Sequence, residues 1–424
     1  MRLHADELSD VLAITPLTAP PDAALRPPGS KSITNRALIC AALAPGRSTL
    51  TGVLFADDTH AMLDAVRALG ATLMLDEPAS TVVVDGIDPR TASGEVTVNA
   101  RQSGTTSRFI LPAAALRPAR GIIDGTPQLR ARPFGPLVDA LRELGATVED
   151  LGQPGFLPVA VTGPVAGGKV PLPGHLSSQF LSGLLMAGPL MADGLSVELT
   201  SPLVSVPYVE ATTAVMAAFG VTVDGLHVRP GAYRATDFAV EPDASAASYL
   251  LAAAAIGAGR VTVEGLGTAS LQGDVRFADL LERMGARVER TADRITVTGT
   301  GTLHGIDVDM ADISDTAQTL AAVAVFADTP TRVRGIGFIR GKETDRIGAV
   351  VAELRRAGID AVEDADGFTI HPGTPAPTAF ETYDNHRMAM SLALLGLRVP
   401  GIVIKDPKCV AKTYPTYFMD LARL

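Results

Sequence analysis

The stretch Leu141-Arg-Glu-Leu-Gly145-Ala-Thr-Val148 closes an amphipathic helical pattern and opens a β-branched strand pattern, and it recurs along the chain. A glycine just after a helix can take the left-handed conformation that ends the last turn. Near copies of the stretch centre on Gly70, Gly220, Gly285 and Gly358. Successive glycines lie 75, 75, 65 and 73 residues apart, a spacing that indicates a duplicated helix–strand unit. The sequence therefore predicts an α/β fold built from repeats.

The repeats also predict how the domains are organised. A chain of 424 residues exceeds the size at which one hydrophobic core usually stops growing. A sixth, shortened copy would end in the segment 414–424, which gives three units in each of two domains. The shorter interval places one chain crossover at 233–243, and the extended Pro27-Pro28 offers the second. We expect one domain over residues 28–236 and the other over residues 1–27 plus 237–424, with the first 16 or so residues a flexible extension.

Charge and composition exclude several classes of protein. A net charge of −10 argues against nucleic-acid binding, which relies on a basic face, but leaves small anionic substrates open. Two cysteines, Cys40 and Cys409, are too few for a disulfide framework and lack the spacing of a zinc site. Neither a signal peptide nor an apolar stretch of about 18 residues is recognisable. We expect a cytoplasmic protein with free thiols, no bound metal and no membrane partner.

The clearest motif is Pro28-Gly-Ser-Lys-Ser-Ile-Thr-Asn-Arg36. It predicts a turn followed by a helix that begins near Ser32, so Lys31 would lie at a helix N-terminus, where backbone N–H groups favour anions. Ser32 and Arg36 would share one helical face. The motif is not a P-loop, because Ser30 rather than glycine precedes Lys31. A capped helix with a solvated lysine and arginine is the alternative.

Further polar clusters also stand at expected helix starts. Glu343 and Arg346, for example, would share a helical face. Each cluster alone is explained by a helix cap or a surface ion pair. Together they place at least one cluster in nearly every repeat, which predicts that helix N-termini of both domains converge on an anionic ligand. The clusters are Arg101–Arg108, Pro127–Pro133, Ser177–Gln179, Lys342–Arg346, Tyr383–Met388 and Asp406–Thr413.

The chain carries four motifs in this order: PGSKSxTNRA, SSQFxSxLL, KETDR and HRMAM. By these motifs the chain resembles the 5-enolpyruvylshikimate-3-phosphate synthase family from about Ala24 to Leu424. The resemblance implies a two-domain inside-out α/β barrel, with three repeated helix/strand units per domain and the active site in the interdomain cleft. It implies transfer of the carboxyvinyl group of phosphoenolpyruvate to the 5-hydroxyl of shikimate 3-phosphate, releasing phosphate, by addition–elimination within aromatic amino acid biosynthesis. It implies no cofactor, and we expect a monomer that closes over its substrates.

The resemblance also implies roles for single residues. Asp315 and Glu343 are the expected acid/base pair, with Lys31 as a further proton carrier. Arg346 and Arg387 are expected to clamp a carboxylate. Expected contacts to shikimate 3-phosphate come from Ser32, Arg36, Ser177, Ser178, Ser205, Tyr208 and Lys342, with Gln179 touching both substrates. Expected contacts to the phosphate of phosphoenolpyruvate come from Lys31, Gly104, Arg132 and Lys412. Asp315 and His386 complete the expected substrate contacts.

The chain departs from the family pattern in places, and two other functions remain as alternatives. A related enolpyruvyl transferase acts on UDP-N-acetylglucosamine and typically offers a reactive loop cysteine, whereas Cys40 falls in an apolar helical pattern. A non-catalytic binding repeat protein would not need Asp315, Glu343 and Lys31. The departures are Gln102-Ser103 where Asn-Ala is frequent, Phe109 where Pro is frequent, Phe338 where a polar residue is common, and Asn385 where Asp is usual.

Overall fold

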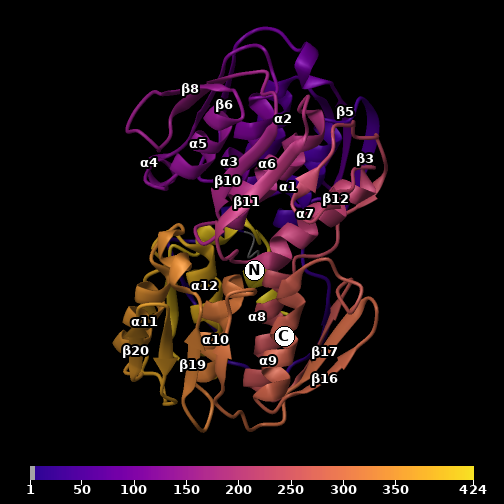
Figure 1. The fold of residues 1–424 in the computed structure, drawn as a ribbon. Coiled ribbons are helices and arrows are strands. Elements are labelled where there is room, and N and C mark those ends of the chain that lie inside the picture. The colour runs from indigo at the N-terminus through magenta and orange to yellow at the C-terminus, as the bar shows by residue number, and fades with distance from the viewer. Residues whose placement is uncertain (1–4) are drawn as a thin grey trace. The chain divides into compact units, whose positions relative to one another are not determined.

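The computed structural model describes residues 5–424, and the chain forms two compact units (Figure 1). The central unit is one continuous segment, Gly29–Glu241. The terminal unit combines Met1–Pro28 with Pro242–Leu424. The chain thus passes from one unit to the other twice, after Pro28 and after Glu241. None of the helices between residues 5 and 424 combines the length and apolar character that a membrane crossing requires.

The central unit contains three repeats of the same order: a strand, a buried helix, a parallel strand, a second helix and an antiparallel hairpin. The first consists of β14 (Phe238–Ala239), α1 (Lys31–Ala42), β3 (Gly46–Thr51), α2 (Asp57–Leu69), β4 (Thr72–Asp76) and β5 (Thr81–Gly86). The second has β6 (Val96–Asn99), α3 (Gly104–Ala114), β7 (Gly121–Asp124), α4 (Pro127–Arg130), α5 (Gly135–Glu143), β8 (Thr147–Asp150) and β9 (Val159–Thr162). The third has β10 (Gly168–Pro173), α6 (Ser178–Ala187), β11 (Leu195–Ser201), α7 (Val206–Ala218), β12 (Val223–Asp224) and β13 (His227–Val228).

The first two repeats of the terminal unit follow this order, with short 3-10 helices before some of the helices, and the third lacks the hairpin. Its first repeat has β2 (Asp22–Leu25), α8 (Ala244–Gly257), β15 (Arg260–Glu264), η4 (Gly273–Arg276), α9 (Phe277–Arg283), β16 (Arg287–Arg290) and β17 (Arg294–Thr298). The second has β18 (Asp307–Asp309), η5 (Ser314–Thr316), α10 (Ala317–Ala324), β19 (Thr331–Arg334), η6 (Gly337–Gly341), α11 (Arg346–Arg356), β20 (Ala361–Asp364) and β21 (Gly367–Ile370). The third has β22 (Ala379–Phe380), α12 (His386–Ala393), η7 (Leu394–Leu397), β23 (Val403–Lys405), η8 (Pro407–Lys412) and α13 (Tyr417–Leu421).

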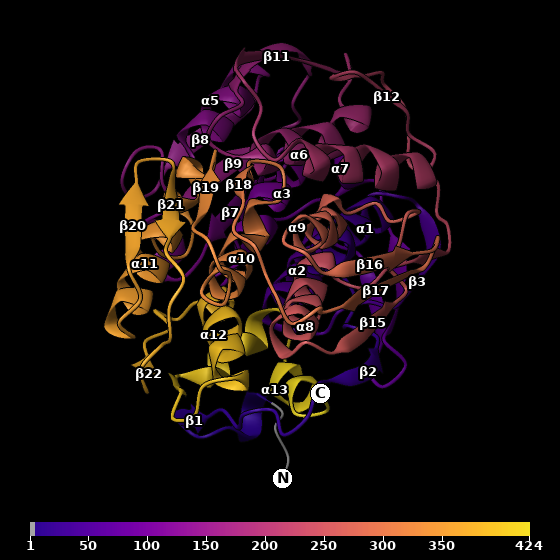
Figure 2. The same ribbon diagram turned by 90° about the horizontal axis from the view of Figure 1, so that it is seen from below.

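In each unit the first helix of every repeat lies inside and the sheets lie outside. Helices α3, α10 and α12 are buried along their whole length, including the polar residues at the start of α3 and α12. Figure 2 shows α8, α10 and α12 next to one another, with β15–β17 on one flank and β20–β21 on another. The predicted inside-out α/β fold, with three repeated units per domain, is confirmed.

The five repeated glycines close their helices as the sequence predicts. Gly70, Gly145, Gly220, Gly285 and Gly358 have φ values of 117°, 100°, 85°, 106° and 80°. At each one the glycine N–H and the following N–H bond back to carbonyls of the last helical turn, as in a Schellman motif. At the first copy these bonds run from Gly70 to Arg67 and from Ala71 to Val66, at 2.9 and 3.1 Å.

The N-terminal segment differs from the expected flexible extension. Residues 11–13 form β1 (Val11–Ala13), which pairs antiparallel with β23, and Leu17 N donates to Leu397 O at 2.9 Å. The shortened sixth repeat has no hairpin of its own, so the edge of β23 is open to another strand, and the N-terminus supplies it. Ala5 N also donates to Pro415 O at 2.9 Å. The expectation is therefore wrong for residues 5–16, whereas residues 1–4 lie outside the described part of the chain.

Candidate functional site

The polar clusters of the central unit lie at helix N-termini, as the sequence predicts. Lys31 and Gly104 are the first residues of α1 and α3, and Ser178 is the first residue of α6. The preceding serine caps each helix by accepting a backbone N–H: Ser30 for α1, Ser103 for α3 and Ser177 for α6. The first-turn N–H groups of these helices have no partner within their helix, and they favour anions.

Lys31 contacts a carboxylate that the sequence analysis did not single out. Its Nζ lies 3.3 Å from Oδ2 of Asp58, and the two side chains are 13% and 5% exposed. Asp58 lies in the first turn of α2, and its backbone O accepts a hydrogen bond from Thr106 Oγ1 of α3 at 3.2 Å. Two acidic residues at a helix start look like an ordinary first turn in the sequence, so only the packing of α1 against α2 reveals this pair.

Arg36 is a buried cation, 1% exposed, that joins three helices. Its Nε donates to Thr212 Oγ1 at 2.7 Å, and its two terminal nitrogens donate to the carbonyls of Ser32 (2.9 Å) and Tyr208 (3.0 Å). The guanidinium lies 5.2 Å from the ring centroid of Phe109, so this departure from the family pattern provides a cation–π partner. Burial lowers the pKa of Arg36 to about 10.

Gly104 and Arg132 lie against each other. A β-carbon on Gly104 would come within 2.5 Å of a terminal nitrogen of Arg132. Arg132 is 6% exposed, and within residues 5–424 its buried Nε has no hydrogen-bond partner. A buried, incompletely bonded guanidinium beside a helix N-terminus is a suitable site for an anion.

Gln179 is bound by Arg108, which like Asp58 is not among the predicted site residues. Its Oε1 accepts a hydrogen bond from Arg108 of α3 at 2.7 Å, and its Nε2 donates to Thr105 Oγ1 at 3.3 Å. Arg108 is buried, and its guanidinium lies 5.1 Å from the ring centroid of Phe180. Ser205 is also buried, and it precedes α7 in the left-handed conformation with φ 55°.

In the terminal unit, two arginines bind one carboxylate. Arg346 donates to Oδ1 of Asp315 at 2.8 Å, and Arg387 donates to Oδ2 at 2.5 Å. Arg387 also donates to the carbonyl of Asp315 at 3.0 Å. Arg346 is the first residue of α11 and Arg387 is the second residue of α12, whereas Asp315 belongs to η5, just before α10. Three segments far apart in sequence therefore meet at one carboxylate.

Glu343 is held by two cations but lies outside the helix. Its Oε2 accepts from Arg346 at 2.5 Å, and its Oε1 accepts from Lys412 at 3.2 Å. The expectation that Glu343 and Arg346 share a helical face is wrong. Asp345 caps α11 by accepting the N–H groups of Ile347 and Gly348, so the helix begins only at Arg346. The turn before the cap brings Glu343 to the arginine instead.

The remaining predicted residues of this unit have separate environments. His386 is the first residue of α12 and is buried behind the cap of Asn385, whose side chain accepts the Arg387 N–H at 2.9 Å. The ammonium of Lys342 lies 6.0 Å from the ring centroid of Phe338. Phe338, which stands where the family commonly has a polar residue, is therefore close to a predicted site residue.

A buried carboxyl next to Asp315 was not anticipated from the sequence. Asp274, in η4, is 3% exposed and accepts a hydrogen bond from the Ser245 hydroxyl. Burial and the nearby carboxylate of Asp315 raise the pKa of Asp274 to about 7, against the opposing effects of the Ser245 hydrogen bond and Arg387. In the sequence Asp274 stands between ordinary surface residues, so no local signal marks it.

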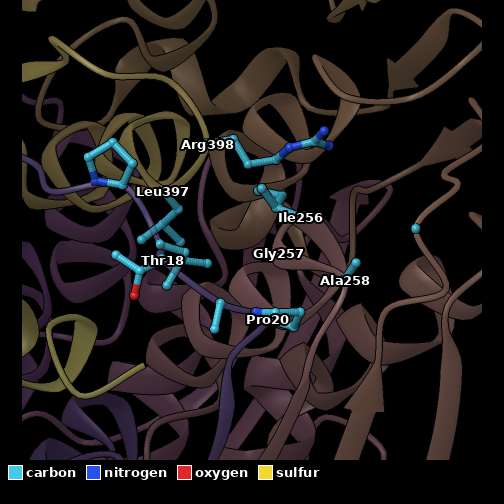
Figure 3. Close-up of a pocket in the computed structure, with 11 residues that line it drawn as sticks. Thr18, Pro20, Ile256, Gly257, Ala258, Leu397 and Arg398 are labelled. Carbon is cyan, nitrogen blue, oxygen red and sulfur yellow. The ribbon is translucent and has the colours of Figure 1, made fainter.

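A cavity elsewhere in the terminal unit carries none of the predicted residues. It has a volume of about 370 Å³ and is lined mainly by apolar residues around Leu17, Ile256 and Leu397. Figure 3 shows that Thr18 and Arg398 are the labelled residues with polar side chains. The Arg398 guanidinium lies 5.1 Å from the ring centroid of Phe326. The cavity thus lacks the clustered cations and carboxylates of the helix N-termini.

Comparisons with known proteins agree over nearly the whole chain. The family description "EPSP synthase (3-phosphoshikimate 1-carboxyvinyltransferase)" matches residues 18–421. A 3-phosphoshikimate 1-carboxyvinyltransferase from Nostoc sp. is 44% identical over 96% of this chain and 98% of that protein. The protein of that name from Serratia proteamaculans is 44% identical over 94% of this chain and 95% of that protein. The chain belongs to the EPSP synthase family.

Solved structures agree with this membership. An EPSP synthase from Acinetobacter baumannii has a TM-score of 0.82 and 28% identity, and covers 97% of this chain and 98% of that one. The enolpyruvyl transferase NikO from Streptomyces tendae has a TM-score of 0.78 at 21% identity, covers 98% of this chain and 97% of its own, and shows the shared fold. As a member of the EPSP synthase family the chain is a transferase of the shikimate pathway. The alternatives of a UDP-N-acetylglucosamine enzyme and a non-catalytic repeat protein are not favoured.

Proposed function

We propose that this chain transfers the carboxyvinyl group of phosphoenolpyruvate to the 5-hydroxyl of shikimate 3-phosphate and releases phosphate. The observation that supports the residue roles is the cluster in which Arg346 and Arg387 share the carboxylate of Asp315. Two guanidinium forks that already hold one carboxylate are built to hold a second, that of phosphoenolpyruvate. We propose that the enzyme acts as a monomer in the cytoplasm.

Phosphate recognition falls to the central unit and to Lys412. Arg132 has a buried Nε without a hydrogen-bond partner in the described part of the chain, and it lies over Gly104 at the start of α3. Together with Lys31 and Lys412, it would bind the phosphate of phosphoenolpyruvate. Shikimate 3-phosphate would be bound by Lys342 and by the helix starts that carry Ser32, Arg36, Ser177, Ser178, Gln179, Ser205 and Tyr208.

The reaction has two steps, an addition and an elimination, and protons are transferred in both. In the addition, the 5-hydroxyl oxygen loses its proton and bonds to C2 of phosphoenolpyruvate, while C3 gains a proton. In the elimination, C3 loses that proton and the bond from C2 to the phosphate oxygen breaks. Asp315 and Glu343, the two carboxylates of this cluster, would accept and return these protons. Lys31 would protonate the departing phosphate or stabilise its charge, and His386 would contact the bound substrate.

The first experiment measures phosphate release from phosphoenolpyruvate with shikimate 3-phosphate as acceptor and, separately, with UDP-N-acetylglucosamine. Release with the first acceptor alone is expected. Release only with the second would overturn the proposal.

Lys31→Met tests the role of the lysine. We expect turnover to fall roughly 10²- to 10⁴-fold, as on loss of a group that transfers protons. This variant also leaves Asp58 without its partner, 3.3 Å away, so Asp58→Asn is measured beside it to separate the loss of this buried ion pair from the loss of the ammonium. Lys169→Met removes a lysine whose Glu198 ion pair is exposed and should change nothing. Near-normal turnover of Lys31→Met would refute the role.

A further inference from the structure

The segment that delivers Arg387 to the site is conformationally strained. It joins β22 to α12, and two consecutive residues in it, Tyr383 and Asp384, have φ values of 57° and 51°. Non-glycine residues rarely adopt this left-handed region, and each one costs free energy that the surroundings must offset. Arg387 follows three residues after this pair. Contacts that hold the segment therefore bear on where the guanidinium lies.

One carboxylate supplies those contacts. Glu353 in α11 is 1% exposed. Its Oε1 accepts from the hydroxyl of Tyr383 at 2.8 Å, and its Oε2 accepts from the backbone N–H of Glu381 at 3.0 Å. Arg356, one turn later, donates to both oxygens and also to the carbonyl of Ala379 at 3.0 Å. The middle of α11 is thus bonded to the end of β22 and to the strained segment as far as Tyr383.

The same helix begins with Arg346, seven residues before Glu353. Seven residues are close to two turns, so the two side chains leave α11 on the same face. Arg346 and Arg387 already meet through Asp315. The Glu353–Tyr383 bond is a second link, between α11 and the segment that leads into α12. Two links restrain the separation of the two guanidiniums more than the shared contact to Asp315 would alone.

We propose that Glu353 is a positioning residue that, through Tyr383 and the Glu381 backbone, holds Arg387 at the spacing from Arg346 that a bound carboxylate needs. The inference rests on the proposed function, in which these arginines clamp phosphoenolpyruvate. Burial and the Glu353 hydrogen bond raise the pKa of Tyr383 to about 12, so its hydroxyl keeps its proton and remains a donor at any assay pH near neutrality.

Tyr383→Phe is the decisive variant, because it removes one hydroxyl from a residue that is 44% exposed and leaves the rest of the segment intact. We expect the KM for phosphoenolpyruvate to rise about tenfold, as for loss of a hydrogen bond to a charged group, with the KM for shikimate 3-phosphate unchanged. Glu353→Gln should shift the same constant further. Tyr233→Phe is the control, since it deletes a buried tyrosine bond to the carbonyl of Met186 in the central unit.

A change in the KM for phosphoenolpyruvate without a change in the KM for shikimate 3-phosphate distinguishes a positioning role from a general effect on stability. A purely structural role would lower the amount of active enzyme and leave both KM values as they are. If Glu353→Gln fails to fold, Tyr383→Phe alone still decides. Wild-type KM values in Tyr383→Phe, or equal rises for both substrates, would overturn the inference. Absence of turnover in the wild-type protein would instead contradict the proposed function.

Discussion

Gly104→Ala should weaken the binding of phosphoenolpyruvate by displacing an arginine that remains present. The new methyl group would lie 2.5 Å from the nearest terminal nitrogen of Arg132 and 2.9 Å from Cζ. Ordinary contact begins at 3.4 Å, so the guanidinium has to move by about 0.9 Å. A phosphate contact of about 2.9 Å that lengthens by this amount is no longer a hydrogen bond.

The magnitude follows from the bond that is lost. Hydrogen bonds to charged groups contribute about 1.5–3 kcal/mol, which is roughly a 10- to 150-fold change in affinity. We therefore expect the KM for phosphoenolpyruvate to rise at least about tenfold. The fold should be retained, because Gly104 starts α3 at an ordinary negative φ, where alanine is tolerated. Steady-state phosphate release at varied phosphoenolpyruvate, with saturating shikimate 3-phosphate, measures the change.

A double-mutant cycle tests the reasoning directly. If Gly104→Ala acts only through Arg132, the double variant Gly104→Ala/Arg132→Gln should have nearly the same KM for phosphoenolpyruvate as Arg132→Gln alone. Gly135→Ala is the matched control, because its β-carbon meets nothing closer than 3.8 Å. An unchanged KM in Gly104→Ala, or the same increment with and without Arg132, would refute the explanation.

Two further predictions concern stability. Asp274→Asn should remove a pH dependence: because the pKa of Asp274 is raised from 3.8 to about 7, its stabilising contribution is complete below about pH 4 and is lost as the pH rises through 7, by at most about 4 kcal/mol. The urea midpoint of Asp274→Asn should therefore rise relative to that of the wild type between about pH 4 and 7, and a constant difference across this range would contradict the prediction. Gly358→Ala should cost about 1–2 kcal/mol from backbone strain alone, since φ is 80° and nothing lies within 4 Å of the added carbon. Gly341→Ala has the same open space without the positive φ, so equal urea midpoints in the two variants would argue against strain.

Local chemistry explains why much of the fold could be predicted. A glycine after an amphipathic helix is a short-range signal, and all five glycines have the left-handed conformation that closes a helix. The serine caps of α1, α3 and α6 are equally local, so the helix starts that carry Lys31 and Gly104 could be located within about a residue. The start of α11 was misplaced because Asp345, rather than a residue before Glu343, provides the cap.

The repeat, the helix starts and the residue types at them could be read from the amino-acid sequence, because each depends on neighbours within a few positions. The partners of these residues depend on how the chain packs. Three acidic residues look ordinary in the sequence but have specific partners in the structure. They are Asp58 beside Lys31, Asp274 near Asp315, and Glu353, which binds the hydroxyl of Tyr383. The pairing of β1 with β23 is likewise a contact across almost the whole chain. Such contacts arise when elements that are separate in the sequence pack together, and no local pattern encodes which carboxylate meets which cation.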